Sequence, residues 1–343
     1  MSFSVKNTIS VLLKYIVPLI ITIGLCWLLF KGMDLREMWA TMRAECDFRW
    51  MWGNLAFCVC AMLSRAARWR IQLKALGIRA SLWELTLSVF GTYSVNLVLP
   101  RLGEVWRCGF VAQRRRAPFA EVFGSMVADR LADTVCVALI TLATFTFAGS
   151  GLLSYLNQDG SRADSLVAIA SSPLLWGGLA LCLGVVVWVF VSHPDNKIVS
   201  RIRQIATGLW KGFAVIATMP GKGRWLLYTV GVWTSYILAM WCAFQSFPLT
   251  ERVIDHYGAQ ALMLCFVLTS ISMAVPSNGG IGPYQWALIF GLGIYAAGIP
   301  GLDYAYSAAF ANMLMGTQTL FLILLGLFTF GWIALSKKKL EKV

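Results

Sequence analysis

Three ionisable residues stand at regular spacing in the otherwise apolar stretch NLVLPRLGEVWR, residues 96–107. Arg101, Glu104 and Arg107 follow one another at intervals of three, so a helix would place them on one face. A guanidinium group grips phosphate through two parallel hydrogen bonds. A carboxylate in an apolar setting must take up a proton or find a cation. The spacing predicts a site where the two arginines bind phosphate and Glu104 orients them or carries a proton, with the same stretch supplying Asn96, Pro100 and Gly103.

A second group of charges follows in VADRLADTV, where Asp129 and Asp133 lie one helical turn apart on one face, with Arg130 between them. Charges this dense inside a membrane usually mark a transport pathway or a substrate site. The alternative is a structural salt-bridge network near the cytoplasmic interface. The sequence leaves both interpretations open.

A third stretch, PSNGGIGPYQW at residues 276–286, carries almost no charge. Glycine lets backbone N–H groups approach a ligand closely, and the polar side chains here can hydrogen-bond a sugar or a headgroup. The alternative is a tight turn with capping residues. The predicted site residues in this stretch are Pro276, Ser277, Asn278, Gly279, Gly280, Gly282 and Gln285.

The composition says what kind of chain must hold these groups. Of 343 residues 58% are hydrophobic and 13% charged, against about 25% charged in soluble domains. The apolar residues come in continuous blocks, which predicts an all-α polytopic membrane protein. The net charge of +13 fits cytoplasmic loops near anionic lipid better than nucleic acid. With no nucleophile–base pair and no Cys/His metal spacing, we expect no catalytic residues, metal or cofactor.

Nine apolar blocks alternate with polar stretches of unequal charge. Basic residues cluster at 65–79, 114–116, 197–224 and in the tail, so the positive-inside rule predicts an inner-membrane protein with both termini in the cytoplasm. Two amphipathic segments are expected to lie along the membrane surface, Asp195–Met219 and the arginine-rich Ser64–Gly77. The blocks are Tyr15–Phe30, Trp50–Leu63, Leu82–Leu99, Gly124–Ala148, Pro173–Val191, Trp225–Phe247, Ala259–Val275, Tyr284–Ala297 and Tyr304–Leu335.

The charge map forces block 82–99 to turn back, because basic segments precede and follow it. We expect a re-entrant hairpin with its tip at Leu99–Gly103, and a second one around Pro276 that enters from the outside. Pro100 and Pro276 lie 176 positions apart, about half the chain. This predicts one membrane domain over 1–343 with six full crossings, two re-entrant hairpins and an inverted repeat of halves 9–148 and 173–335. The alternative is eight or nine ordinary helices joined by Gly/Pro loops.

Four motifs in order, SRAARWRIQLKALG, NLVLPRLGEVWR, DRLAD and VPSNGGIG, resemble the lysylphosphatidylglycerol synthase transmembrane-region family, also called flippase-like domain proteins. The resemblance runs from about Ser10 to Leu335. Two positions depart from the family's usual pattern: Asp129 and Gln285 both stand where a glutamate is usual. The resemblance implies a domain that moves lipids between leaflets, here expected without the aminoacyl-transferase domain of the fused synthases.

We therefore expect a lipid transporter for a phospholipid, aminoacyl-lipid or polyprenyl-phosphate-type lipid, whose headgroup binds between the two hairpin tips. The main alternative is a non-transporting accessory subunit of a lipid-modifying or glycosyltransferase complex. A membrane-embedded transferase acting through Glu104, Asp129 and Asp133 is a further one. The expected partners are membrane lipids and, under the main alternative, such an enzyme.

Overall fold

A computed structural model describes residues 44–157, 197–275 and 277–340. These ranges contain helices and no strands, so the predicted all-α class is confirmed. The chain runs through α4 (Phe48–Ala75), α5 (Leu82–Val98), α6 (Leu102–Arg115), α7 (Phe119–Asn157), α10 (Lys197–Thr218), α11 (Lys222–Gln245), α12 (Pro248–Tyr257), α13 (Ala259–Ser272), α14 (Pro283–Tyr295), the short 3-10 helix η2 (Ala296–Gly298) and α15 (Tyr304–Leu340).

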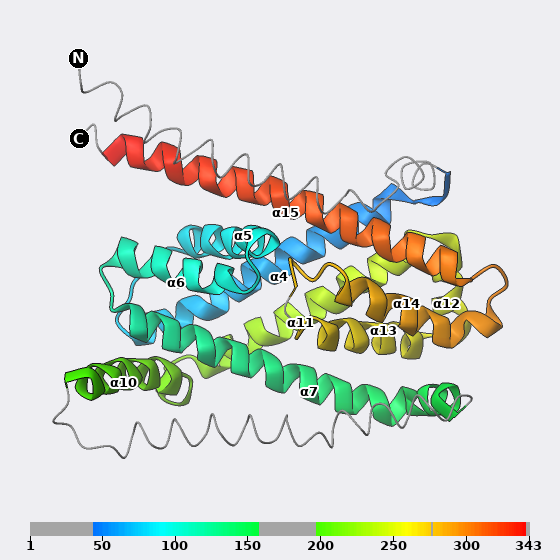
Figure 1. The fold of residues 1–343 in the computed structure, drawn as a ribbon, viewed down its shortest axis with the longest axis horizontal. Helices are drawn as coiled ribbons and strands as arrows, with labels where there is room; N and C mark the ends of the chain where they lie inside the picture. The colour runs from blue at the N-terminus through cyan, green and yellow to red at the C-terminus, as the bar shows by residue number, and fades with distance from the viewer. Residues whose placement is uncertain (1–43, 158–196, 276, 341–343) are drawn as a thin grey trace.

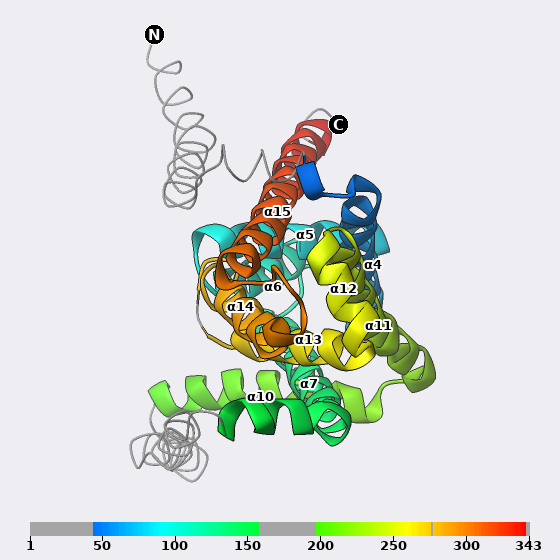
Figure 2. The ribbon, with the colours of Figure 1, turned by 90° about the vertical axis from the view of Figure 1, so that its right-hand side faces the viewer.

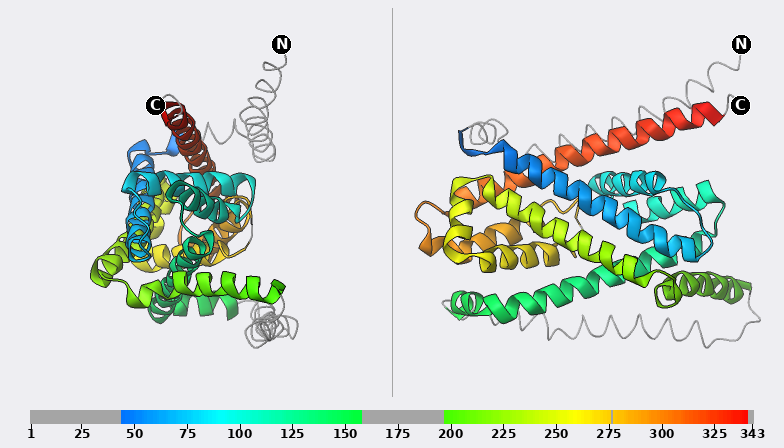
Figure 3. Two further views of the ribbon diagram at one scale, coloured as in Figure 1. Left: turned by 90° about the vertical axis from the view of Figure 1, so that its left-hand side faces the viewer. Right: turned by 180° about the vertical axis from the view of Figure 1, so that it is seen from behind.

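Long helices run from one end of the molecule to the other (Figure 1). Helices α4 and α11 lie side by side along most of their length, as the view from behind shows (Figure 3). By length and composition, two of the described helices can each cross a membrane: α11, over Lys222–Gln245, and α15, over Tyr304–Ser336. The pair α12–α13 passes the same test as a unit but bends by 116° at its break.

Two helix pairs, α5–α6 and α13–α14, occupy opposite ends of the molecule with their connecting turns facing the middle (Figure 1). The break between α5 and α6 falls within the predicted tip: α5 ends at Val98 and α6 begins at Leu102. Pro100 lacks an N–H group and cannot continue the helix, and Arg101 adopts a left-handed conformation with φ of 65°. The second turn, residues 273–282, depends on glycines with positive φ, and Pro283 then starts α14.

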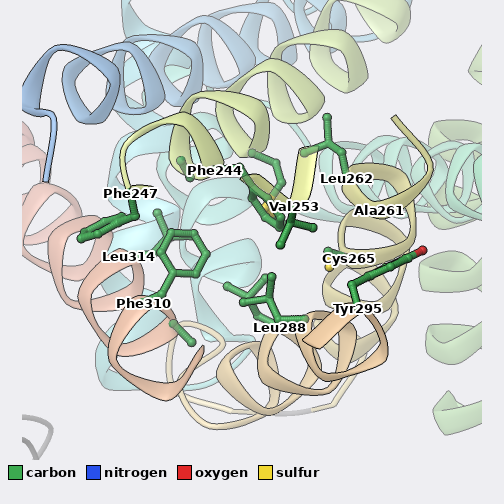
Figure 4. Packing of buried hydrophobic residues seen from close by; sticks show 14 of the residues in the cluster. Phe244, Phe247, Val253, Ala261, Leu262, Cys265, Leu288, Tyr295, Phe310 and Leu314 are labelled. Carbon is green, nitrogen blue, oxygen red and sulfur yellow. The ribbon is translucent and has the colours of Figure 1, made fainter. Parts of the chain in front are cut away.

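A large apolar core surrounds the second helix pair (Figure 4). Helices α13 and α14 are apolar on nearly all sides, which suits helices enclosed by others. Phe310 of α15 packs edge-on against Phe244 and Phe247, with ring centroids 5.6 and 5.4 Å apart. This core fixes the direction in which the second turn points toward the first.

The two segments that were predicted to lie along the membrane surface have different structures. Ser64–Gly77 is not a separate surface helix, because α4 continues through it without a break and buries Arg65 and Arg68. The segment 195–219 does form a helix, α10, which packs on α7 on the side of the molecule opposite α15 (Figure 2). Glycines at the crossing bring the two backbones together: a Cβ at Gly212 would collide with the carbonyl oxygen of Glu121.

Several predictions concern residues outside the described ranges. The blocks Tyr15–Phe30 and Pro173–Val191, Pro276 and both chain ends lie there. The count of six crossings, the inverted repeat and the repeat halves therefore stay predictions. The polar stretch Pro248–Tyr257, which lies between two of the apolar blocks, forms the short helix α12.

Candidate functional site

The two turns meet in the middle of the molecule. The guanidinium of Arg101 donates hydrogen bonds of 2.8 Å to the carbonyl oxygens of Met273 and Ala274, where α13 ends. The backbone N–H of Gly279 donates to the carbonyl oxygen of Asn96, at 3.0 Å. The predicted stretches thus form one junction, although the bonded residues stand 172 to 183 positions apart in the sequence.

The first turn is held by contacts among its own residues. The side-chain oxygen of Asn96 accepts a 2.8 Å hydrogen bond from the backbone N–H of Gly103, one of the free donors at the start of α6. Position 103 has no room for a side chain, because a Cβ there would collide with the carbonyl oxygen of Thr92 and with Asn96. The amide group of Asn96 also donates to Glu104, at 3.3 Å. These contacts explain why Asn96, Gly103 and Glu104 belong to one unit.

The structure removes Arg101 from the predicted grouping, whereas Glu104 and Arg107 both lie on α6 at a spacing of three residues. Arg101 precedes α6 and points to the end of α13. The ion-pair partner of Glu104 is Arg130 on α7, at 3.6 Å. Arg107 is fully buried, and the carboxylate near it is Asp129, at 4.0 Å, and not Glu104. The left-handed backbone at Arg101 explains its removal from the grouping, because it rotates that side chain off the helical series.

The aspartates of α7 pair with two arginines of α4 that the sequence analysis assigned to a cytoplasmic surface. Arg68 lies 2.8 Å from Asp129 and 2.8 Å from Asp133, and Arg65 lies 2.5 Å from Asp133. All four residues are buried. A signal was available: Arg65 and Arg68 recur with the apolar Met62, Ala66, Trp69 and Leu73 at helical spacing, on the face that α4 buries.

Arg107 is fully buried and poorly partnered. Its guanidinium carbon lies 4.0 Å from the centre of the Trp69 ring, and one of its nitrogens lies 4.0 Å from Asp129 Oδ2. None of its three nitrogens has a hydrogen-bond partner within the described residues. Buried polar groups in native proteins are nearly always hydrogen-bonded. Arg107 is thus a buried cation with free hydrogen-bond donors next to the hairpin turn.

The buried charges do not balance within this group. Three buried arginines face two buried carboxylates, which leaves one excess positive charge. The buried members are Arg65, Arg68 and Arg107 on one side and Asp129 and Asp133 on the other, whereas the partly exposed Arg130 and Glu104 pair with one another at the edge of the group. The excess charge and the unbonded donors fall on the same residue, Arg107, so an anion is the ligand that this arrangement can accept.

The second turn supplies backbone groups and no charge. The hydroxyl group of Ser277 donates a hydrogen bond of 3.4 Å to the carbonyl oxygen of Val275, two residues earlier in the same turn. A Cβ at Gly279 would collide with Leu97, and one at Gly280 with Met273. The carbonyl oxygen of Asn278 accepts from the N–H of Ile281, at 3.1 Å. These residues shape the turn, and their capacity to bind a ligand stays a prediction.

Comparison with known proteins decides the family. The profile described as the lysylphosphatidylglycerol synthase TM region matches residues 15–326 of this chain. The chain belongs to this family. A curated relative, the UPF0104 membrane protein MJ1595 of Methanocaldococcus jannaschii, is 23% identical over 242 residues, which covers 66% of this chain and 69% of the relative. No solved structure matches the chain.

As a member of the lysylphosphatidylglycerol synthase TM region family, the chain is a helical membrane protein, and the resemblance carried by its motifs is confirmed. The two positions that depart from the family's usual pattern, Asp129 and Gln285, have different surroundings. Asp129 lies in the buried network with Arg68. The side-chain oxygen of Gln285 accepts from the N–H of Gly282 at 2.8 Å, and its amide donates to Asn312 on α15 at 2.5 Å. A glutamate at position 285 could not make the second bond when ionised.

Proposed function

We propose that this protein moves a phosphate-bearing lipid between the two leaflets of the membrane, with the headgroup bound between the two turns. The observation that carries the proposal is Arg107, a fully buried guanidinium whose nitrogens lack hydrogen-bond partners in the described structure. A phosphate oxygen pair fits such a group in charge and in geometry.

The surroundings of Arg107 support an anion further. The buried group has one excess positive charge, which a phosphodiester with one negative charge would neutralise. The start of α6 lies little more than one helical turn before Arg107, and the positive pole of the helix dipole favours an anion there. Glu104 would orient Arg130 and Asn96, with which it makes contact, or carry a proton during transport.

A path for the acyl chains is available on the outside of α7. Large apolar side chains form an exposed stripe that begins next to Arg130 and runs toward the far end of the helix. Lipid tails could follow this stripe while the headgroup moves through the protein. The stripe consists of Val127, Leu131, Val135, Leu139 and Leu142, which are 40 to 66% exposed.

The contact between the turns suggests how access could alternate. Arg101 bridges to the end of α13 through carbonyl groups alone, so few bonds must break for one turn to withdraw. Under this proposal the protein resides in the inner membrane with both termini in the cytoplasm, the orientation that the basic residues favour.

Purified protein in liposomes that contain fluorescently labelled phosphatidylglycerol tests the proposal. A reductant added from outside destroys the label in the outer leaflet, so the further loss of fluorescence measures transport. We expect Arg101→Gln and Glu104→Gln to reduce the rate at least tenfold while the protein remains folded. Arg224→Gln provides a control, because Arg224 is exposed at the start of α11, away from the site.

Wild-type rates in both site variants would contradict the assignment of the site. If the wild-type protein moves no lipid but retains a soluble transferase during purification, the accessory-subunit alternative holds instead. A purified protein that converts the labelled lipid to a product, and loses this activity in Asp133→Asn, would be an embedded transferase.

A further inference from the structure

A wide, open depression of about 440 Å³, called the cavity below, lies at the end of the molecule where α4 ends and α6 joins α7. Its wall is formed by the turn after α4, by the last residues of α6 and by the beginning of α7. The lining residues are Leu76, Gly77, Ile78, Arg79, Arg115, Arg116, Ala117, Pro118 and Glu121. The polar groups among them are mostly cationic.

Two of the three lining arginines carry uncompensated charge. Arg115 pairs with the buried Glu84, and the lining carboxylate Glu121 pairs with Lys211 of α10 at 2.8 Å. Arg79 and Arg116 are exposed and make no ion pair or hydrogen bond within the described residues. Two positive charges therefore face this cavity without a counter-ion among the described residues.

Of the three helix ends around the cavity, the start of α7 favours an anion, and the negative ends of α4 and α6 are in part closed by their own turns. Carbonyl oxygens at the end of α4 accept hydrogen bonds from Leu76, Gly77 and Ile78, and the end of α6 is closed by the N–H of Ala117 bonding to Ala112. The first N–H groups of α7, from Phe119 onward, have no partner within the helix. The free donors and the positive pole of a 39-residue helix thus add to the two arginines.

The cavity is separate from the junction of the hairpin turns. Arg116 stands nine residues after Arg107, so about 13 Å of α6 lies between them at 1.5 Å per residue. The amphipathic helix α10 borders the cavity through the Lys211–Glu121 pair, and its Trp210 is 66% exposed. Tryptophan is typical of the headgroup level of a membrane, which brings phosphate groups of lipids within reach of this cavity.

We propose that this cavity binds the phosphate group of an anionic ligand, held by Arg79, Arg116 and the start of α7, with the headgroup of an anionic phospholipid as its source. Basic pockets between helices at the cytoplasmic side of a membrane recognise such headgroups. Because about 13 Å of α6 separates Arg116 from Arg107, we expect the site to bind its ligand independently of transport.

Native mass spectrometry of the purified full chain in detergent tests the proposal with phosphatidylglycerol, phosphatidylcholine and the soluble glycerol 1-phosphate as probes. We expect the combined variant Arg79→Gln with Arg116→Gln to bind phosphatidylglycerol about 10- to 30-fold more weakly at this site. Phosphatidylcholine, which carries no net charge, should bind weakly to every variant.

The matched control removes two exposed basic residues elsewhere, Lys222→Gln with Arg224→Gln, and we expect its affinity to stay within twofold of wild type. Arg107→Met eliminates the junction site, so binding that persists in Arg107→Met and is lost when Arg79 and Arg116 are also replaced belongs to the cavity.

If glycerol 1-phosphate binds as tightly as the lipid with the same dependence on Arg79 and Arg116, the ligand is a soluble phosphate ester; if only the lipid binds, it is a headgroup. Equal affinities of wild type and the Arg79/Arg116 variant, or equal losses in the control, would overturn the proposal.

Discussion

Replacing Arg107 by methionine separates two roles that a buried arginine can have, binding a ligand or holding helices together. Methionine keeps an unbranched apolar side chain against Trp69 and removes the charge. If Arg107 serves a ligand, the variant should fold as well as the wild type and transport no lipid. Functional groups are often unfavourable for stability, so this combination is typical of a binding site.

The size of the effect on stability follows from the contacts of Arg107. Attraction to Asp129 at 4.0 Å contributes about 4 kcal/mol at an effective dielectric constant of about 20. The position over the Trp69 ring adds about 2 kcal/mol. Against this, desolvation of a buried ion costs several kcal/mol, and unbonded donors add about 1–3 kcal/mol. The contributions nearly cancel, so Arg107→Met should change the free energy of unfolding by less than about 2 kcal/mol.

Asp129→Asn is the matched comparison, because it removes a negative charge from the same buried group from which Arg107→Met removes a positive charge. It leaves Arg68 without the carboxylate that lies 2.8 Å from it and raises the excess charge of the group. Breaking a buried pair in this way destabilises by about 3–5 kcal/mol. Unfolding in mixed detergent, followed by tryptophan fluorescence, measures both variants, and the liposome assay measures transport.

A loss of stability in Arg107→Met as large as that in Asp129→Asn would refute this reasoning and make Arg107 a structural residue. Unchanged transport in a stable Arg107→Met protein would refute the ligand role.

The other predictions concern the first turn and the orientation. Gly103→Ala should destabilise the protein by about 1–3 kcal/mol through overpacking and slow transport, whereas Gly109→Ala on the same helix, where nothing lies within 4 Å of an added Cβ, should be neutral or slightly stabilising in the same unfolding experiment. In a cysteine-free background, a membrane-impermeant maleimide added from outside should label Glu251→Cys on α12 and leave Arg116→Cys unlabelled; the reverse pattern would invert the predicted orientation.

The helix breaks could be predicted from the sequence because they depend on local chemistry. Pro100 removes a donor, and the glycines of the second turn allow positive φ. The charge map then indicated that the residues on both sides of the first break return to the same end. Helices α5 and α6, and α13 and α14, follow this pattern in the structure.

The partners within the site could not be predicted in the same way. Arg65 and Arg68 were counted as surface charges, because the positive-inside rule treats basic residues by their sequence neighbourhood and takes no account of a carboxylate on another helix. Arg101 left the face of Glu104 because of a left-handed backbone that helical spacing cannot foresee. Likewise, Asn312 had no sequence signal to connect it with Gln285 across 27 positions.

The junction between the two turns has a consequence for how freely its sequence can change. On the second turn, the described groups that hydrogen-bond to Arg101 or Asn96 all belong to the main chain: the carbonyl oxygens of Met273 and Ala274 and the N–H of Gly279. Any amino acid supplies a carbonyl, so positions 273 and 274 can be substituted without loss of these bonds. Among the residues of this contact, only position 279 is confined to glycine, by the nearby Leu97. The first turn must therefore keep its side chains, whereas the second must keep the glycines that shape it and can vary at positions 273 and 274 without loss of these bonds.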